Sequence, residues 1–327
     1  MPETHGRLAP HEPGTHAGTA AAAVLMVRPA SFGWNPETQA SNSYQRNDSA
    51  VAADAPSRAT QEFDSVAGAL REAGIEVHAL DDRPDPACAD AVFPNNWVSF
   101  HPDGTVVLYP MLARSRRLER RMDLLLQLEN AGGFEVRRLV DLTHHEHSGA
   151  FLEGTGSIVL DHAARIAYAC LSPRTHAAPL RDFCDELGFE PCVFEATDSG
   201  GQPVYHTNVV LSVGGSVAVV GTENIVAADR ERVLERLGRS GRECVQIDRA
   251  QVAGFAANVL ELQGRDGSRV LAMSDCAARS FSAVDMRRIR SAVDHVVAVP
   301  IPTIEALGGG SVRCMLAEIF LPRRHTS

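Results

Sequence analysis

The feature that most constrains the fold is a pattern of β-hairpin, helix and strand that recurs about every 50 to 60 residues. Each hairpin consists of two β-enriched runs around a short turn, and Asp-Gly or Gly-Gly pairs mark several of these turns. The hairpins are expected at residues 96–109, 156–170, 207–220 and 258–273. A unit that repeats at this period predicts a radially or linearly repeated architecture.

Each hairpin leads into a helix-like segment and then into a further β-enriched piece such as 135–139 or 295–300. The helices are expected at residues 114–130, 173–187, 228–237 and 282–292. A fifth unit can be formed only by joining the two ends of the chain, with strand 24–29, helix 58–73 and strand 312–320. This pairing would close the sheet edges, so we predict an α/β fold, a five-bladed pseudo-symmetric α/β-propeller of ββαβ-type units.

Composition sets the class of protein and the domain plan. The 327 residues carry a formal charge of -10, which argues against nucleic acid or an anionic membrane as the main partner. The sequence has no apolar run of the ~18 residues that span a bilayer. We expect a leader at 1–22, one catalytic domain at 23–323 and a tail at 324–327. A homo-oligomer is compatible with this plan.

The seven cysteines show no C-x-x-C spacing, so neither a zinc site nor a dithiol site is expected. An odd number of thiols without a disulfide framework is typical of a reduced, cytoplasmic protein. We therefore expect a cytoplasmic enzyme that needs no metal and no cofactor.

Overlaying the repeats places one polar residue at or just before the first strand of each unit. These residues are Asn96, Glu153, His206, Asn258 and Cys314. Equivalent positions of a closed ring converge on its axis, so these side chains should share one cavity. A thiol, an imidazole and a carboxylate in one cavity supply a nucleophile, a proton carrier and an orienting group.

The stretch before Cys314 strengthens its assignment as the nucleophile. Gly308, Gly309 and Gly310 let the backbone turn sharply and leave room for a ligand beside the main chain. The other six cysteines, outside this register, are expected to be structural.

Six motifs show that the chain resembles the guanidine-modifying or amidinotransferase superfamily, the penteins. The motifs lie at 35–38, 93–97, 152–157, 171–175, 205–208 and 308–314. The resemblance spans residues 24–322 and is greatest to the branch of citrulline-hydrolase type. Members of the superfamily include arginine deiminases, dimethylarginine hydrolases and glycine amidinotransferases.

The resemblance implies a five-fold α/β-propeller and a small amino-acid substrate. It also implies that Cys314 is the nucleophile, His206 the general acid and base, and Glu153 the carboxylate beside the substrate nitrogens. A thiolate that attacks a urea or guanidine carbon would form a carbamoyl or amidino thioester, which water then hydrolyses.

Two positions depart from the arginine deiminase pattern, in which aspartates match Asn96 and Asn208. An amide offers both a donor and an acceptor, whereas a buried cation without carboxylates is costly. The two asparagines therefore favour a neutral ureido group, as in citrulline or N-substituted citrulline. Asn95 and Asn258 are further candidates for contact with the substrate. Arg174 suits either a substrate carboxylate or a structural salt bridge.

Several alternatives stay open at this point. The substrate could be arginine or a methylated arginine, an amine could replace water in an amidino transfer, or the propeller could bind a ligand without catalysis. Residues 144–147 (His-His-Glu-His) are expected to form a solvated loop rather than a metal site. The basic run 116–121 is expected to form a solvated helix face.

Overall fold

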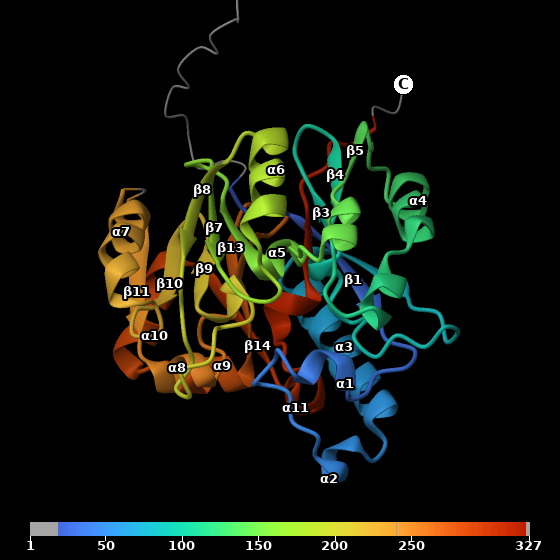
Figure 1. The fold of residues 1–327 in the computed structure, drawn as a ribbon, viewed down its shortest axis with the longest axis horizontal. Helices are drawn as coiled ribbons and strands as arrows, with labels where there is room; N and C mark the ends of the chain where they lie inside the picture. Colours follow the sequence, from blue (N-terminus) through green and yellow to red (C-terminus); the bar gives the residue numbers. More distant parts are fainter. Residues whose placement is uncertain (1–18, 240, 325–327) are drawn as a thin grey trace, which may run out of the picture.

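The structure is a computed structural model that describes residues 19–239 and 241–324 (Figure 1). The expected leader and tail lie mostly outside these residues, and the first strand, β1, spans Ala23–Arg28. None of the helices in the described ranges combines the length and apolar character that a membrane span needs.

Four internal units repeat one order of elements. Their hairpins are β3 (Val98–Phe100) with β4 (Thr105–Leu108), β6 (Ile158–Asp161) with β7 (Ile166–Cys170), β9 (Leu211–Val213) with β10 (Val217–Gly221), and β12 (Leu260–Gln263) with β13 (Arg269–Ser274). The main helices that follow are α4 (Met122–Asn130), α6 (Ala177–Leu187), α7 (Ala227–Gly238) and α10 (Ala283–Ala292), the last preceded by α9 (Asp275–Ser280). The third strands are β5 (Arg138–Asp141), β8 (Glu190–Phe194), β11 (Glu243–Ile247) and β14 (His295–Val299).

Strand pairing is the same in all four units. The hairpin strands are antiparallel, and the third strand lies parallel to the second hairpin strand. The parallel pairing requires the crossover connection that the intervening helix provides. The predicted order of hairpin, helix and strand is therefore confirmed.

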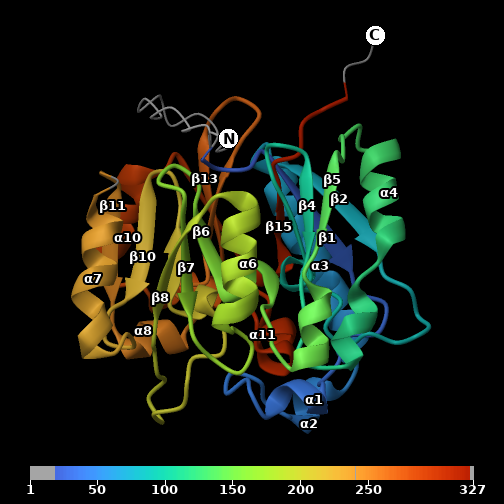
Figure 2. The same ribbon diagram turned by 45° about the horizontal axis from the view of Figure 1, so that its top comes forward.

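The two ends of the chain form a further unit of three strands. β1 pairs antiparallel with β15 (Ala317–Ile319) and parallel with β2 (Glu76–Asp81), to which α3 (Ala55–Glu72) connects it. This pairing of the ends was predicted. One parallel bridge between Ile319 and Phe100 joins this unit to the first internal one. The result is a six-stranded sheet of order β2-β1-β15-β3-β4-β5, beside three three-stranded sheets (Figure 2).

Local chemistry explains the hairpin turns. The carboxylate of Asp103 accepts a hydrogen bond from the Thr105 amide at 2.9 Å, and Asp266 accepts one from the Ser268 amide at the same distance. An aspartate that bonds the backbone two residues later is a common way to form a tight turn. The Asp-Gly pairs therefore mark two hairpins correctly.

Helix α3 shows how the helices bury one face. Its fully buried residues Ala59, Phe63, Val66 and Leu70 are spaced by three or four positions and lie on one side of the helix. This side contacts β1, β14 and α11 (Pro302–Gly308). Packing of this kind holds the unit formed by the chain ends against its neighbour.

Short helical turns stand at the entrance of most units, immediately before or close to the first strand. They are η1 (Pro94–Asn96), α5 (Gly154–Ser157), η4 (Thr207–Val209) and η5 (Val312–Met315). Two further short helices, α1 (Pro36–Gln39) and α2 (Ser49–Ala52), lie with α11 at one end of the molecule (Figure 2). α8 (Arg249–Ala253) and η3 (Thr143–Ser148) complete the described helices.

Some predicted bounds are wrong. Residues 312–320 are not one strand, because Cys314 lies in the turn η5 and only Ala317–Ile319 pair. Residues 114–130 form two pieces, the turn η2 (Ser115–Glu119) and α4, because the buried side chains of Arg116 and Glu119 fix the path of η2. Helix α6 starts four residues later than expected, since the amide of Thr175 bonds the carbonyl of Ser172 in a turn.

Candidate active site

The five polar residues in equivalent register stand at or beside the entrance turns. Asn96 ends η1, Glu153 caps α5, His206 precedes η4, Cys314 lies within η5 and Asn258 stands two residues before β12. Each is at most 3% exposed. Asn96, His206 and Cys314 line one narrow cavity, while Glu153 bonds His206 and Asn258 contacts Cys314.

Glu153 and His206 form a buried hydrogen-bonded pair, with 2.9 Å between Oε2 and Nε2. Burial raises the pKa of Glu153, but Arg174, the hydrogen bond to His206 and Arg116 outweigh it and lower this pKa to about 2. Burial also lowers the pKa of His206 to about 4, against the opposing effect of Glu153. At neutral pH a carboxylate therefore faces a neutral imidazole whose Nε2–H donates to it, and Nδ1 carries the lone pair.

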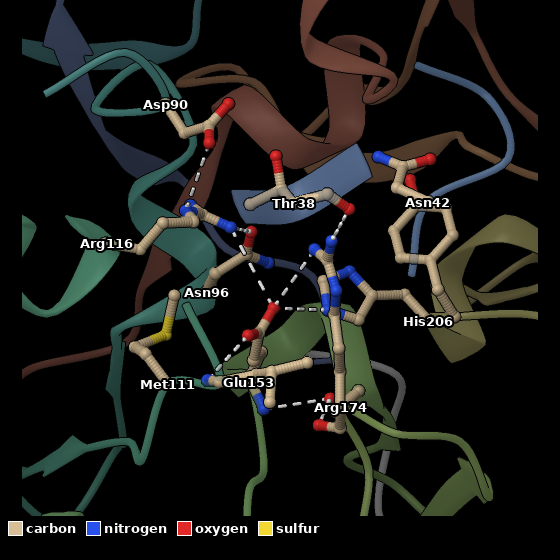
Figure 3. Close-up of polar contacts among 12 residues, drawn as sticks. Thr38, Asn42, Asp90, Asn96, Met111, Arg116, Glu153, Arg174 and His206 are labelled. Atoms are coloured by element: carbon tan, nitrogen blue, oxygen red, sulfur yellow. Dashed lines mark hydrogen bonds and ion pairs between the residues drawn. The ribbon is translucent and has the colours of Figure 1, made fainter. Parts of the chain in front are cut away.

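Two buried guanidinium groups also approach Glu153 (Figure 3). Nη1 of Arg174 lies 3.4 Å from Oε2 of Glu153, and Nη1 of Arg116 lies 3.9 Å from the same oxygen. Arg174 also donates to the carbonyl of Thr38 and to Oγ of Ser41, both at 2.8 Å. The charge of Glu153 is thus already balanced within the protein, and the structural salt bridge considered for Arg174 is present.

Arg116 and Glu119 are site residues that sequence reasoning missed. The expectation that residues 116–121 form a solvated helix face is wrong for both, since they are 2% and 4% exposed. Arg116 donates to both carboxylate oxygens of Glu119 and to Oδ1 of Asn96, each at 2.9 Å, and its Nε lies 3.8 Å from Asp90. An Arg and a Glu three residues apart share one side of a helical turn, and this spacing was the available signal.

The crowding of charge around Arg116 shifts the ionisation of its partners. Burial raises the pKa of Glu119 to about 7, although Arg116 opposes the shift. Burial likewise raises the pKa of Asp90, which also accepts a hydrogen bond from Nδ2 of Asn35 at 2.8 Å. Arg116 therefore lies among three carboxyl groups, those of Glu119, Asp90 and Glu153.

The sulfur of Cys314 is surrounded by amide groups. Nδ2 of Asn258 lies 3.3 Å and Nδ2 of Asn208 lies 3.5 Å from Sγ. The backbone amide of Cys314 donates to the carbonyl of Ser311 at 3.0 Å, which closes the turn η5. Two amide donors therefore point at the sulfur, and the thiolate is the reactive form of a cysteine.

The glycine turn before Cys314 requires glycine for two physical reasons. Gly309 has φ +65°, a conformation that residues with a side chain rarely adopt, and a Cβ there would lie 2.6 Å from Nδ2 of Asn42. The hydroxyl of Tyr205 donates to the Gly309 carbonyl at 2.6 Å and holds the turn in place. The turn therefore places Cys314 by close packing against Asn42 and Tyr205.

A narrow cavity opens between these groups, with free space of only about 10 Å³. This volume holds about one water molecule. Thr38 and Asn42 from the segment after β1 form part of its wall, with Arg174 and Phe93. The cavity as it stands is therefore too small for an amino acid, and Arg174 in its wall donates to the carbonyl of Thr38.

Among the described residues, three asparagines of the entrance turns, besides Asn224 elsewhere, keep amide atoms without a hydrogen-bond partner. These buried atoms are Nδ2 of Asn96, Oδ1 of Asn208 and both amide atoms of Asn95. The carbonyl oxygen of Asn95, by contrast, packs against Gly154, where a Cβ would come within 2.1 Å of it. Buried polar atoms usually have partners, so the unpaired Nδ2 of Asn96, which lines the cavity, suggests a group reserved for a ligand.

The other six cysteines differ from Cys314 in their surroundings. Burial raises the pKa of Cys88 to about 11 and that of Cys170 and Cys184 to about 12. Burial also raises the pKa of Cys192, Cys244 and Cys276. These thiols are expected to stay protonated and unreactive at neutral pH.

Fold and comparisons together define the class: a mixed α/β protein of the pentein superfamily, and a hydrolase acting on C–N bonds other than peptide bonds. Residues 28–321 match the family described as "N,N dimethylarginine dimethylhydrolase, eukaryotic", and the chain belongs to this family. It is a hydrolase that acts on the guanidino group of an arginine-related compound or on a chemically similar group. No curated protein matches the chain.

Solved structures agree on the fold. The chain is similar to the product-bound N-terminal domain of ArgZ, an arginine dihydrolase from the ornithine-ammonia cycle in cyanobacteria, with a TM-score of 0.71 and 16% identity over 92% of this chain and 99% of that one. A cysteine-to-alanine mutant of AgrE with L-arginine gives a TM-score of 0.72 and 16% identity over 93% of this chain and 41% of AgrE. A cysteine-to-serine mutant of DDAH from Pseudomonas aeruginosa, complexed with citrulline, gives 0.62 and 14% over 92% and 100%.

Proposed function

We propose that the chain hydrolyses the ureido group of citrulline or an N-substituted citrulline. In this proposal Cys314 is the nucleophile, His206 the general acid and base, and Glu153 the carboxylate that orients His206 and the substrate nitrogens. The proposal includes the closed five-bladed arrangement of the repeated units within one catalytic domain, because that arrangement would bring the equivalent entrance turns to one axis.

The observation that carries the neutral substrate is the pair of buried guanidinium groups beside Glu153. Arg174 and Arg116 lie within 4 Å of its Oε2, so the carboxylate already has two cationic neighbours. A guanidinium substrate would add a third cation to the same dry cavity, where Asp90, the carboxyl group of the lining, already accepts a hydrogen bond from Asn35 and lies 3.8 Å from Nε of Arg116. Burying a charge without a partner costs several kcal/mol. A neutral ureido group avoids this cost.

The unpaired amide atoms support the same choice. Nδ2 of Asn96 is a donor and Oδ1 of Asn208 is an acceptor, and both are buried without a partner among the described residues. A ureido group has a carbonyl oxygen that accepts and nitrogens that donate, so it matches one atom of each kind. Two aspartates at these positions would offer acceptors only. Asn95 is kept as a further candidate for contact with the substrate.

The proposed reaction starts from the neutral imidazole. His206 takes the proton of the Cys314 thiol, and the amide groups of Asn208 and Asn258 stabilise the thiolate. The thiolate attacks the ureido carbon, and His206 passes its proton to the departing nitrogen as the C–N bond breaks. Water, deprotonated by His206, then cleaves the carbamoyl thioester. The carbamate that leaves decomposes to ammonia and carbon dioxide, and ornithine is the other product of citrulline.

Two candidate binding residues take separate roles in this proposal. Asn258 acts on the sulfur, because its Nδ2 lies 3.3 Å from Sγ of Cys314. Arg174 keeps its contact with Glu153 and exchanges its hydrogen bond to the Thr38 carbonyl for the substrate carboxylate, which its fixed fork of donors fits. The proposed mechanism uses side chains of the protein and water, without a metal ion. We also propose that the protein is cytoplasmic.

The test is the ratio of kcat/KM for matched ureido and guanidino substrates, citrulline and arginine first. The parent chain should favour citrulline. The double variant Asn96→Asp/Asn208→Asp should lose citrulline turnover by at least about a hundredfold, as expected for two lost polar contacts, and gain relative activity on arginine. Asn224→Asp, a buried asparagine outside the cavity, is the matched control. A parent chain that prefers arginine would overturn the neutral-substrate proposal.

The second candidate is hydrolysis of arginine or a methylated arginine. It is favoured by family membership and by the arginine-bound AgrE structure. The same panel, extended with dimethylarginine and scored for ammonia and alkylamine, separates the two. Dependence of the rate on an added amine acceptor would instead indicate amidino transfer.

A further inference from the structure

Outside the active site, the histidine-rich turn η3 meets helix α6. His144, His145 and Asp182 each offer one ligand atom there, and the three atoms lie within 4.8 Å of one another. Nε2 of His145 is 2.8 Å from Oδ2 of Asp182, and the rings of His144 and His145 have centroids 4.3 Å apart. We call this group the His144–His145–Asp182 cluster.

The composition of the cluster differs from the run of four residues in the sequence. Glu146 points away to Arg117 and Arg120, with which it forms ion pairs. Nδ1 of His147 donates to the carbonyl of His144 at 3.0 Å. As expected, the four consecutive side chains do not converge on one point. The third ligand comes instead from α6, 37 residues further along the chain than His145.

We infer that the His144–His145–Asp182 cluster binds a divalent transition-metal ion of the zinc and nickel type. Imidazole nitrogens together with a carboxylate oxygen suit these ions better than calcium or magnesium, which prefer oxygen ligands alone. The ion takes the place of the proton between Nε2 of His145 and Asp182, and the neutral ring of His145 carries its proton on Nδ1 instead.

The surroundings of His144 fit this role. Its Nδ1 donates to the backbone carbonyl of Asp141 at 3.1 Å, which leaves the lone pair on Nε2. Histidines that bind metal usually donate their other ring nitrogen to a carbonyl or carboxylate, which fixes the ring orientation. His144 is therefore already in the form that binds a metal ion.

An open groove of about 490 Å³ beside the cluster supplies access and negative charge. His144, Asp182, Asp185 and Glu186 line it, together with Arg138. Arg138 pairs with Glu186 at 2.7 Å and neutralises that carboxylate, so Asp141, Asp182 and Asp185 carry the remaining negative charge of the groove. Water from the open groove can fill the other positions of the ion.

The ion would connect two elements that otherwise meet through one hydrogen bond of this cluster. η3 also carries Glu146, which accepts a hydrogen bond from the amide of Met111 at 2.9 Å. The next amide, that of Leu112, donates to Oε1 of Glu153 at 3.1 Å. Binding of the metal ion therefore stabilises η3, the turn that holds the backbone beside Glu153. This stabilisation does not depend on which substrate the active site takes.

The test is calorimetric titration of Zn²⁺ into the full chain carrying Cys314→Ser, since the thiol of Cys314 is a competing zinc ligand. In this background, His145→Ala and Asp182→Asn remove ligands, whereas His147→Ala removes a neighbouring imidazole outside the cluster. The parent and His147→Ala should bind one equivalent of Zn²⁺. The affinity for Zn²⁺ should be at least about tenfold weaker in His145→Ala and Asp182→Asn. Ni²⁺ should show the same pattern.

Thermal unfolding gives a second measurement. Excess Zn²⁺ should raise the Tm of the parent and of His147→Ala, because a ligand that binds only the folded state stabilises it, but not that of His145→Ala or Asp182→Asn. Thermal unfolding without metal verifies that each variant is folded. If His145→Ala does not fold, Asp182→Asn alone is compared with the parent. Equal affinity in all four proteins, or an equal loss in His147→Ala, would overturn the inference.

Discussion

Oε2 of Glu153 lies 2.9 Å from Nε2 of His206, and the same oxygen lies within 4 Å of the guanidinium groups of Arg174 and Arg116. One carboxylate oxygen therefore accepts a hydrogen bond from an imidazole and lies beside two cations. The cations satisfy the negative charge, and the imidazole stays neutral because burial disfavours its protonated form. In the proposed mechanism this neutral imidazole is the base that accepts the thiol proton of Cys314.

Replacement of the nucleophile gives the first prediction. Cys314→Ala should reduce turnover by about three orders of magnitude or more, since the covalent intermediate cannot form. Cys276→Ala is the control, because Cys276 is a half-buried free thiol outside the cavity. Alanine at Cys88, Cys170, Cys184, Cys192 or Cys244 should change only stability. Near-normal turnover by the Cys314 variant would exclude thiolate catalysis.

The amides around the sulfur give the second prediction. Asn258→Ala should lower the rate of alkylation of Cys314 by iodoacetamide at pH 7 by about tenfold, as expected for the loss of one hydrogen bond to a charged group. Asn208→Ala should have a similar effect, since its Nδ2 is also near Sγ. Asn224→Ala should leave the alkylation rate unchanged. Mass spectrometry of the alkylated cysteine measures this, and unchanged rates in both variants would contradict the proposed role of the amides.

Gly154 gives the third prediction. Its φ is +46°, and a Cβ there would lie 2.1 Å from the carbonyl oxygen of Asn95, so Gly154→Ala must displace backbone next to Glu153. We expect the unfolding free energy to fall by more than about 2 kcal/mol and turnover to be lost. Gly133 also has a positive φ, +69°, but no atom lies within 4 Å of the Cβ that Gly133→Ala would add.

The comparison of the two glycine variants separates a clash from backbone strain. Gly133→Ala should cost about 1 kcal/mol in chemical denaturation and keep its activity. Equal losses in the two variants would mean that the contact between Gly154 and Asn95 is unimportant.

The pH dependence of stability gives the fourth prediction. The pKa of His206 is lowered from 6.5 to about 4 in the folded chain, mainly by burial, so the unfolded chain binds more protons between these values. The unfolding free energy should therefore fall as the pH drops through this window, by up to about 1.4 kcal/mol per pH unit for this residue. Above pH 6.5 the contribution of His206 is fully present.

His101 and His162 act in the same direction, because burial lowers their pKa to about 3 and about 4. His206→Asn should therefore retain a fall in stability but with a shallower slope between pH 4 and 6.5. Urea denaturation at several pH values measures the slopes. Identical slopes in the parent and the variant would show that His206 is not held neutral by burial.

The sequence was sufficient for the repeated units because their signals are local. An Asp-Gly turn, the alternation of two short strands and the apolar spacing of a helix such as α3 each depend on neighbouring residues. The pairing of β1 with β15 joins distant segments, yet it followed from counting incomplete units. The bounds of η5 and η2 were wrong because side chains buried against other units fix those turns.

The site was predictable in its members but less so in their partners. Register brought Glu153, His206 and Cys314 together, whereas the burial of Arg116 depends on Asp90, Glu119 and Asn96 at once. Asn208 was expected to face the substrate, and its Nδ2 contacts the sulfur while its Oδ1 stays unpaired. The packing between units decides which atoms of a buried side chain contact which neighbour, and the sequence pattern does not contain this information.

The entrance turns have an evolutionary consequence. Each unit presents a polar residue at or close to the start of its first strand: Asn96, Glu153, His206, Asn258 and Cys314. A lineage that duplicates such a unit inherits a ready set of converging side chains, and specialisation requires only that the copies diverge. New chemistry in this scaffold can therefore arise by exchanging the residue in one copy while the other four, and the fold, stay as they are.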